Sequence, residues 1–313
     1  MSFTRMNTPC PMMIESHNIQ VLCVGHASYD LIFSVPHHPE ADEKIFAESL
    51  ISCGGGPAAN AAVTVARLGY KAAFAGYLGN DLYGQIHHEE LQQEKVSTDL
   101  IVRGLSPTPL SAILIKPDGK RVLVNYKSGT EPLPAKSIDF SAVTPKVILF
   151  DGHEPAISEP LCAWARSRSI PTVLDAGSLH KGTDALMFSV DFLVCSEKFA
   201  RQWLDDNDPE RALNHLAERS PTVVITLGEH GLIWKKGTES GRLPAFPVKA
   251  VDTTGAGDAF HGAFAAALAK GQCWQDILRY ASAAGALCCT QAGARPGIPD
   301  REKVELFLKS QKQ

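Results

Sequence analysis

The sequence predicts an α/β protein with three layers, α/β/α, built on a mainly parallel central sheet and carrying a small β-sheet lid. Three observations support this fold class. A short apolar run at 19–25 ends in glycine, as expected of a first, buried parallel strand. From residue 146 onward, apolar runs alternate with helical segments, which is typical of a parallel sheet covered on both faces. Between these regions, residues 110–126 have the pattern of a β-hairpin.

The composition is compatible with one large domain, which we expect at 19–313 after a flexible tail at 1–18. A net charge of −4 and a pI near 6.3 argue against nucleic acid as a partner. No apolar run reaches the roughly 18 residues that a membrane span needs. The 8 cysteines form no C-x-x-C pair, so we expect reduced thiols in a cytoplasmic protein that does not associate with membranes.

Asp30 follows the first predicted strand. Ligands of open α/β sheets collect at the carboxyl ends of the strands, so this carboxylate is placed to accept hydrogen bonds from the hydroxyls of a ligand. The alternative is an aspartate that only caps a loop.

The lid is expected to consist of strands at about 31–53 and 108–128. Prolines and an acidic patch separate the first segment from the main sheet, and a Pro-Asp-Gly-Lys turn at 117–120 closes the second. Lys44, the one lysine of the first segment, either faces the substrate or is solvated. Asn125, near the end of the hairpin, either reaches the substrate or satisfies backbone groups.

A glycine run at 54–56 leads into a helix that extends through Leu68. No Gly-Lys-Ser/Thr follows, so the run is not a P-loop, but it lets backbone approach a ligand closely. A strand at 71–77 and a helix through Glu94 come next. The helix contains His87-His88 and Glu89-Glu90, and we expect a solvated face there, because adjacent residues diverge around a helix and do not share one metal ion.

The second half of the chain alternates regularly between strands and helices. Strands are expected at 147–151, 171–175, 192–195 and 222–227, and helices between 151 and 169, near 197–204, near 209–219, at 280–290 and at 302–309.

The stretch 251–262 combines an anion cradle with a candidate base at one helix start. Gly255-Ala256-Gly257 lets bare backbone N–H groups face a ligand, and a helix N-terminus attracts phosphate oxygens. Asp258 follows in the first turn, where its carboxylate can accept a proton from a hydroxyl that attacks phosphorus. The alternative is a purely structural role, in which the threonines cap the helix and Asp258 only complements the helix dipole.

This stretch resembles the C-terminal signature of the ribokinase-like, or PfkB, carbohydrate kinases, Asp-Thr-x-Gly-Ala-Gly-Asp followed by an aromatic residue and a glycine. Gly55-Gly56 with Asn60 resembles the N-terminal signature of the same family, and the resemblance extends from about residue 19 to the end. It implies a ribokinase-like fold and transfer of a phosphoryl group from ATP to a sugar, with Mg²⁺ bridging the ATP oxygens.

The resemblance also implies roles for individual residues. Asp258 would be the general base, and Gly255, Ala256 and Gly257 would stabilise the transferring phosphoryl group. The implied substrate-binding residues are Asp30, Lys44, Gly55, Gly56, Asn60 and Asn125. The implied ATP-binding residues are Glu197, Thr226, Gly228 and Gly231, with Glu197 also near Mg²⁺ through water. Asp252, Thr254 and Gly293 would surround a monovalent cation such as K⁺.

Several positions depart from the pattern of related families. Pro57 stands where ribokinase has lysine, and Ser196 and Phe199 break the family's Asn-x-x-Glu element. Three motifs resemble the sulfofructose kinase branch and, more distantly, fructokinases: Gly-Gly-Gly-Pro-Ala-Ala at 54–59, Val-Asn-Tyr at 124–126 and Ala-Arg-Pro-Gly-Ile-Pro-Asp at 294–300. In that branch an arginine stands where this chain has His153. We therefore expect a ketohexose or an anion-bearing ketohexose derivative as substrate. The alternatives are ribose or a nucleoside, or a kinase-like protein that senses sugar without turnover. The resemblance further implies a homodimer that forms through the lid strands.

Overall fold

The computed structural model describes residues 18–311, so the predicted tail lies almost wholly outside the described residues. Its large sheet has 9 strands in the order β13-β12-β11-β10-β9-β8-β1-β4-β5. Every neighbouring pair from β11 to β5 is parallel, and β12 is antiparallel to both of its neighbours, β11 and β13. The strands are β1 (Val21–Val24), β4 (Ala72–Gly79), β5 (Ser97–Gly104), β8 (Val147–Phe150), β9 (Thr172–Ala176), β10 (Phe192–Ser196), β11 (Thr222–Thr226), β12 (Leu232–Lys236) and β13 (Glu239–Leu243).

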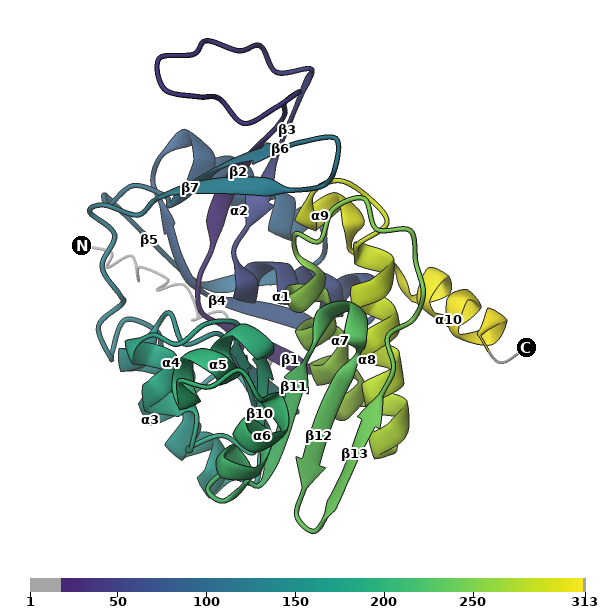
Figure 1. Ribbon diagram of the computed structural model, residues 1–313. Helices are drawn as coiled ribbons and strands as arrows, with labels where there is room; N and C mark the ends of the chain where they lie inside the picture. Colours follow the sequence, from purple (N-terminus) through teal and green to yellow (C-terminus); the bar gives the residue numbers. More distant parts are fainter. Residues whose placement is uncertain (1–17, 312–313) are drawn as a thin grey trace, which may run out of the picture.

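Helices cover both faces of this sheet (Figure 1). In β1, Val21 and Cys23 join one hydrophobic cluster while Leu22 and Val24 join the other, because successive side chains of a strand point to opposite faces. The first cluster includes residues of α1 (Pro57–Arg67), α2 (Leu82–Gln93), α7 (Ala256–Ala269), α8 (Trp274–Cys288) and α10 (Arg301–Ser310). The second includes residues of α3 (Pro155–Ser167), α4 (Lys181–Leu186), α5 (Glu197–Leu204) and α6 (Pro209–Ala217). The predicted three-layer class is confirmed.

The lid is a separate sheet of 4 strands in the order β3-β2-β6-β7. It combines β2 (Ser28–Ser34) and β3 (Ser49–Gly55), which are antiparallel, with the hairpin of β6 (Leu110–Ile115) and β7 (Arg121–Tyr126). Figure 1 shows the lid strands at the top of the molecule, with the loop between β2 and β3 projecting beyond them. Both predicted lid segments thus belong to one sheet, because β2 pairs with β6 in parallel.

Several elements were not anticipated from the sequence, among them β5, α4 and the antiparallel pair β12 and β13. In β5, nearly all positions are of intermediate exposure and Leu100 is buried, so the strand lacks the alternation of buried and exposed residues that marks a strand in the sequence. Among the described residues, none of the helices is both long and apolar enough to cross a membrane.

The predicted solvated face of α2 is wrong at His87. This side chain is 0% exposed, because its ring packs against Gly54 of β3 and against the C-terminal segment α9 (Ala294–Gly297). Gly54 leaves room for it, since a Cβ there would lie 2.3 Å from the ring.

Candidate active site

A cavity of about 320 Å³ opens between the lid and the carboxyl edge of the large sheet. A larger cavity of about 500 Å³ lies near the amino ends of β1 and β4 and contains none of the predicted site residues. The smaller cavity is therefore the candidate site. The predicted residues that line it are Asp30, Gly56, Asn60, Asn125, Thr254 and Asp258.

The anion cradle lies at the start of α7, where the sequence predicted it. Gly255 has φ 78°, and a Cβ at this position would lie 2.6 Å from the Cβ of Ala294, so only glycine fits. Ala256 and Gly257 begin the helix, and no atom blocks the space beside Gly257 within 4 Å. The first turn of α7 is thus open to a ligand.

Asp258 is half-buried and faces the cavity from this first turn. The side-chain amide of Asn60 donates a hydrogen bond of 2.8 Å to Asp258 Oδ2. Burial, followed by the nearby carboxyl of Asp175, raises the pKa of Asp258 to about 7, although the hydrogen bond from Asn60 acts in the opposite direction. A carboxyl group with this pKa takes up and releases a proton near neutral pH.

Asp30 comes from the lid, on β2, and is 5% exposed. The hydroxyl of Ser28 donates to Asp30 Oδ1 at 2.9 Å, and burial raises the pKa of Asp30. Gly55 packs directly against this carboxylate, since a Cβ there would lie 2.2 Å from Asp30 Oδ2. Asp30 and Asp258 therefore approach one cavity from opposite elements, the lid sheet and helix α7.

Basic side chains lie at the same cavity, and the sequence had suggested only His153 among them. His26, Lys127 and His153 contribute to its lining, and the rings of His26 and His153 are 5.1 Å apart. The ring of His180 stacks on His153 at 4.6 Å. Each of these histidines follows a strand of the large sheet, so their position just after a predicted strand could have identified them as candidate site residues.

The buried carboxylate of Asp151 holds the loops of this region together. It accepts hydrogen bonds from the backbone N–H groups of His26 at 2.7 Å, Ala58 at 3.2 Å and His153 at 2.9 Å. A Cβ on Gly25 would lie 1.9 Å from the same carboxylate, which explains the glycine at the end of the first strand. Sequence reasoning placed Asp151 at a strand end but did not single it out.

Lys44 is not part of the cavity lining. It is exposed on the loop between β2 and β3, with its ammonium group 5.9 Å from the ring centre of Phe46. Of the two alternatives given for Lys44, substrate contact or solvation, the structure shows a solvated side chain.

The predicted ATP-binding residues gather at the carboxyl ends of β10 and β11. Glu197 is exposed at the start of α5, Thr226 ends β11, and Gly228 and Gly231 flank a short turn with φ values of 58° and 85°. Among residues 18–311, no group of three or more His, Cys, Asp or Glu side chains could hold a metal ion.

The departures at Ser196 and Phe199 have a structural explanation. The hydroxyl of Ser196 accepts a hydrogen bond of 3.0 Å from the N–H of Phe199 and so caps α5. Phe199 is 0% exposed and belongs to the hydrophobic core.

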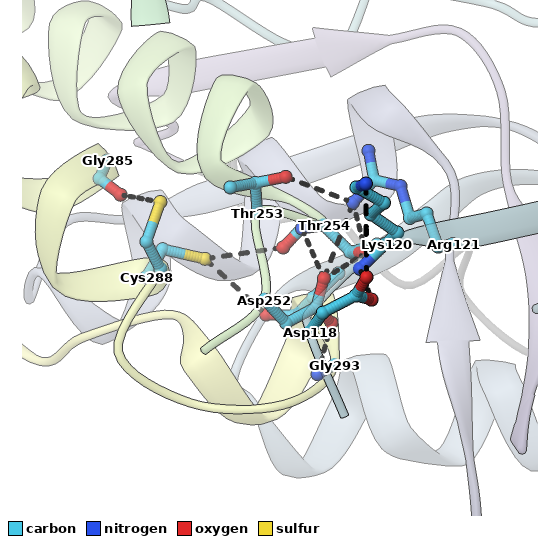
Figure 2. A network of polar contacts seen from close by, with 11 residues as sticks. Asp118, Lys120, Arg121, Asp252, Thr253, Thr254, Gly285, Cys288 and Gly293 are labelled. Carbon is cyan, nitrogen blue, oxygen red and sulfur yellow. Dashed lines mark hydrogen bonds and ion pairs between the residues drawn. The ribbon is translucent and has the colours of Figure 1, made fainter. Parts of the chain in front are cut away.

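Asp252, Thr254 and Gly293, the predicted cation-site residues, lie together beside the cradle (Figure 2). Asp252 accepts hydrogen bonds from the N–H and hydroxyl of Thr254 at 2.9 and 2.7 Å and from the N–H of Gly293 at 2.8 Å. Figure 2 shows Arg121 of β7 reaching this group, with its guanidinium 3.4 Å from Asp252 Oδ1 and hydrogen-bonded to the hydroxyl of Thr254. The lid is therefore tied to the loop that forms the cradle.

A titratable carboxyl beside an open helix start, under a β-sheet lid, defines a small-molecule kinase of the α/β class. Comparison with known proteins then identifies the family. Residues 18–301 match the family described as pfkB family carbohydrate kinase, and this chain belongs to that family. The predicted family and enzyme class are confirmed.

Several relatives are similar to the chain over nearly its whole length. A ribokinase of Bacillus subtilis (strain 168) is 29% identical, covering 92% of this chain and 99% of the relative. A probable fructokinase-5 of Arabidopsis thaliana is also 29% identical, covering 87% and 94%. The crystal structure of a putative ribokinase from Agrobacterium tumefaciens superposes with a TM-score of 0.86 at 28% identity, covering 95% and 99%. Arabidopsis thaliana ribokinase, solved with ribose and ATP, gives a TM-score of 0.82 at 25% identity, covering 93% and 99%.

Proposed function

We propose that this protein transfers the γ-phosphoryl group of ATP to a hydroxyl of a ketohexose or a ketohexose derivative, with Asp258 as general base. The observation that carries the proposal is the position of Asp258. Its carboxyl, with a pKa raised to about 7, faces a cavity beside the N–H groups that begin α7. A base near neutrality next to an anion cradle is what alcohol phosphorylation requires.

The acceptor sugar would bind in the cavity below the lid. Asp30, Asn60 and Asn125 offer hydrogen-bond partners to its hydroxyls. Gly56 lies on the same lining, and Gly55 leaves room for the Asp30 carboxylate beside it. Asp258 would take the proton of the attacking hydroxyl while the N–H groups of Gly255, Ala256 and Gly257 stabilise charge on the phosphoryl group. Closure of the lid would exclude water, which is a competing acceptor.

ATP would bind along the carboxyl ends of β10 and β11, with Glu197, Thr226, Gly228 and Gly231 beside it. The relative solved with ribose and ATP supports this use of the nucleotide. Mg²⁺ bound to ATP neutralises charge on the phosphate oxygens, and Glu197 would hold it through water. Asp252, Thr254 and Gly293 would surround a monovalent cation such as K⁺ and so stiffen the cradle.

Lys127 favours a ketohexose with an acidic substituent over a neutral sugar, because its ammonium group lies on the cavity lining and would attract an anion. Burial, followed by the neighbouring His153, lowers the pKa of His26 to about 3, so this ring contributes hydrogen bonding and no charge near neutral pH. Ribose is the second candidate, because ribokinases are among the relatives, although Pro57 lines the cavity where ribokinase carries lysine.

The direct test is an ADP-release assay over a panel of acceptors: fructose, ketohexoses with a terminal phosphate or sulfonate, ribose and a nucleoside. We expect the highest kcat/KM with an anion-bearing ketohexose. Turnover confined to ribose or the nucleoside would contradict the substrate class. Tight sugar binding without ADP release on any acceptor would indicate a sugar sensor instead.

Asp258→Asn tests the base. It should lower kcat by about 100-fold or more and leave the sugar affinity within about threefold, since the amide keeps the shape but accepts no proton. Sugar binding by the variant, measured calorimetrically, controls for folding. Wild-type kcat in Asp258→Asn would refute the assigned role.

A further inference from the structure

A buried arginine lies behind the candidate base. Arg295, on the short segment α9, is 5% exposed, and a buried charge is costly unless it is paired. Its guanidinium meets three side chains: Nε is 3.2 Å from Asn60 Oδ1, one terminal nitrogen is 3.1 Å from His87 Nε2, and the other is 3.7 Å from a carboxylate oxygen of Glu90. Arg295 does not line the cavity, so it has no direct role in binding sugar.

The chemistry of arginine determines the orientation of the Asn60 amide. A guanidinium only donates hydrogen bonds, so the Asn60 atom that faces Arg295 must be the oxygen. The NH₂ group of the same amide therefore points at Asp258, 2.8 Å from Oδ2. An NH₂ group cannot accept a hydrogen bond from a protonated acid, so this orientation favours the ionised carboxylate.

We propose that Arg295 is a positioning residue, which locks the side-chain amide of Asn60 with its NH₂ group toward Asp258 and so keeps the base ready to accept a proton. The inference rests on the proposed function, because it requires Asp258 to be the base. It assigns a role to a residue of the C-terminal loop that touches neither the cavity nor Asp258 itself.

The surroundings of Arg295 hold the guanidinium in place. Burial, and then the charge of Arg295, lower the pKa of His87 well below its usual value, so its ring is a neutral acceptor. Glu90 also accepts the N–H of Gly54 at 2.6 Å, which connects the guanidinium to the glycine run. Arg67 donates to the carbonyl oxygens of Arg295 and Ile298, each at 2.8 Å, and thereby anchors the segment that carries Arg295.

Four groups act on the pKa of Asp258, and each comes from a different element. Asp175 of β9 and Asp30 of β2 raise the pKa of Asp258, whereas Asn60 of α1 and His261 of α7 lower it. Burial lowers the pKa of Arg295 itself, Glu90 and Glu94 favour the charged guanidinium, and Arg67 opposes it. Arg295 also lowers the pKa of Asp30, so removal of Arg295 would disfavour the ionised forms of both Asp30 and Asp258.

The test is the pH dependence of kcat/KM in Arg295→Met, measured with the best acceptor of the panel and saturating ATP. Without the guanidinium, the amide is free to turn its oxygen toward Asp258, which stabilises the protonated acid. The acidic limb of the profile, where kcat/KM falls as Asp258 is protonated, should move upward by about one pH unit. The variant should therefore have a kcat/KM about tenfold lower than the wild type below neutrality and nearly equal to it above pH ~9. Titration of ATP is common to all variants and cancels in the comparison.

Two further variants separate positioning from stability. Arg295→Lys keeps a positive charge and a hydrogen-bond donor, so the midpoint of its acidic limb should lie close to the wild-type pH. Arg67→Met is the matched control: it removes an arginine that contacts the same segment but not Asn60, so it should lower the melting temperature without moving the limb.

An equal loss of kcat/KM at every pH in folded Arg295→Met, or a limb that does not move, would overturn the inference. If that variant does not fold, Asn60→Ala serves instead: its limb should shift upward in the same way, and an unchanged limb would again overturn the inference. Full activity of Asp258→Asn would instead refute the proposed function, so the two failures are distinguishable.

Discussion

At the scale of single residues, the candidate site depends on carboxyl groups whose protonation the fold controls. Asp258 and Asp30 reach one cavity, and burial is the main cause that raises the pKa of each. Both aspartates were predicted from sequence, because the patterns around them are local. Their pKa shifts were not predictable, since burial results from packing against distant segments.

The pKa of Asp258 predicts how activity depends on pH. Because the folded protein raises this pKa to about 7, the ionised base is depleted as the pH falls below 7. We expect kcat/KM to decrease about tenfold per pH unit below that point. A rate profile from pH ~5 to ~9 checks this, and an acidic limb near pH ~4, the range of an ordinary aspartate, would contradict it.

At the scale of elements, the lid hairpin contributes more than a cover. Arg121 of β7 links the lid to Asp252 and Thr254 at the cradle, as Figure 2 shows. The side chain of Asp252 is 1% exposed and keeps three other donors, so the link itself is not needed for folding. It connects the lid sheet with the loop that leads into α7.

We therefore expect Arg121→Met to weaken lid closure. The KM for sugar should rise by about tenfold, and ATP hydrolysis without sugar phosphorylation should increase, because water enters a less closed site. Steady-state kinetics with separate ADP and sugar-phosphate readouts measure both effects. Lys120→Met is the control, since its ammonium group lies 3.9 Å from Asp118 and its side chain is 77% exposed. Equal effects of the two substitutions would argue against a specific link.

At the scale of the whole molecule, the lid sheet has an open edge at β7. Every residue of this strand is exposed, including Val122, Val124 and Tyr126. Unpaired edges with apolar side chains favour pairing with another chain. We propose that two copies associate through their lid strands. The single-domain boundaries and the cytoplasmic location likewise remain predictions.

Val124→Lys should convert the dimer into a monomer, because a charge on the edge strand disfavours pairing. Light scattering coupled to size-exclusion chromatography measures the mass. Leu306→Lys, on α10, is the control: it alters another exposed apolar residue, 56% exposed, outside the lid. A wild-type protein that is already monomeric at micromolar concentration would contradict the proposal.

The sequence by itself determined the parallel sheet, the lid hairpin and the helix start at 255–257 with its candidate base Asp258, because each depends on neighbouring residues and their backbone preferences. The tertiary structure decided which distant side chains meet. Asn60 and Arg295 are separated by 235 positions, and Arg121 and Asp252 by 131, so no local pattern could pair them. It also buried His87 and left Lys44 in solvent. Contacts of this kind arise only when packing between elements brings donors and acceptors within hydrogen-bond distance, which is why they had to be read from the folded molecule.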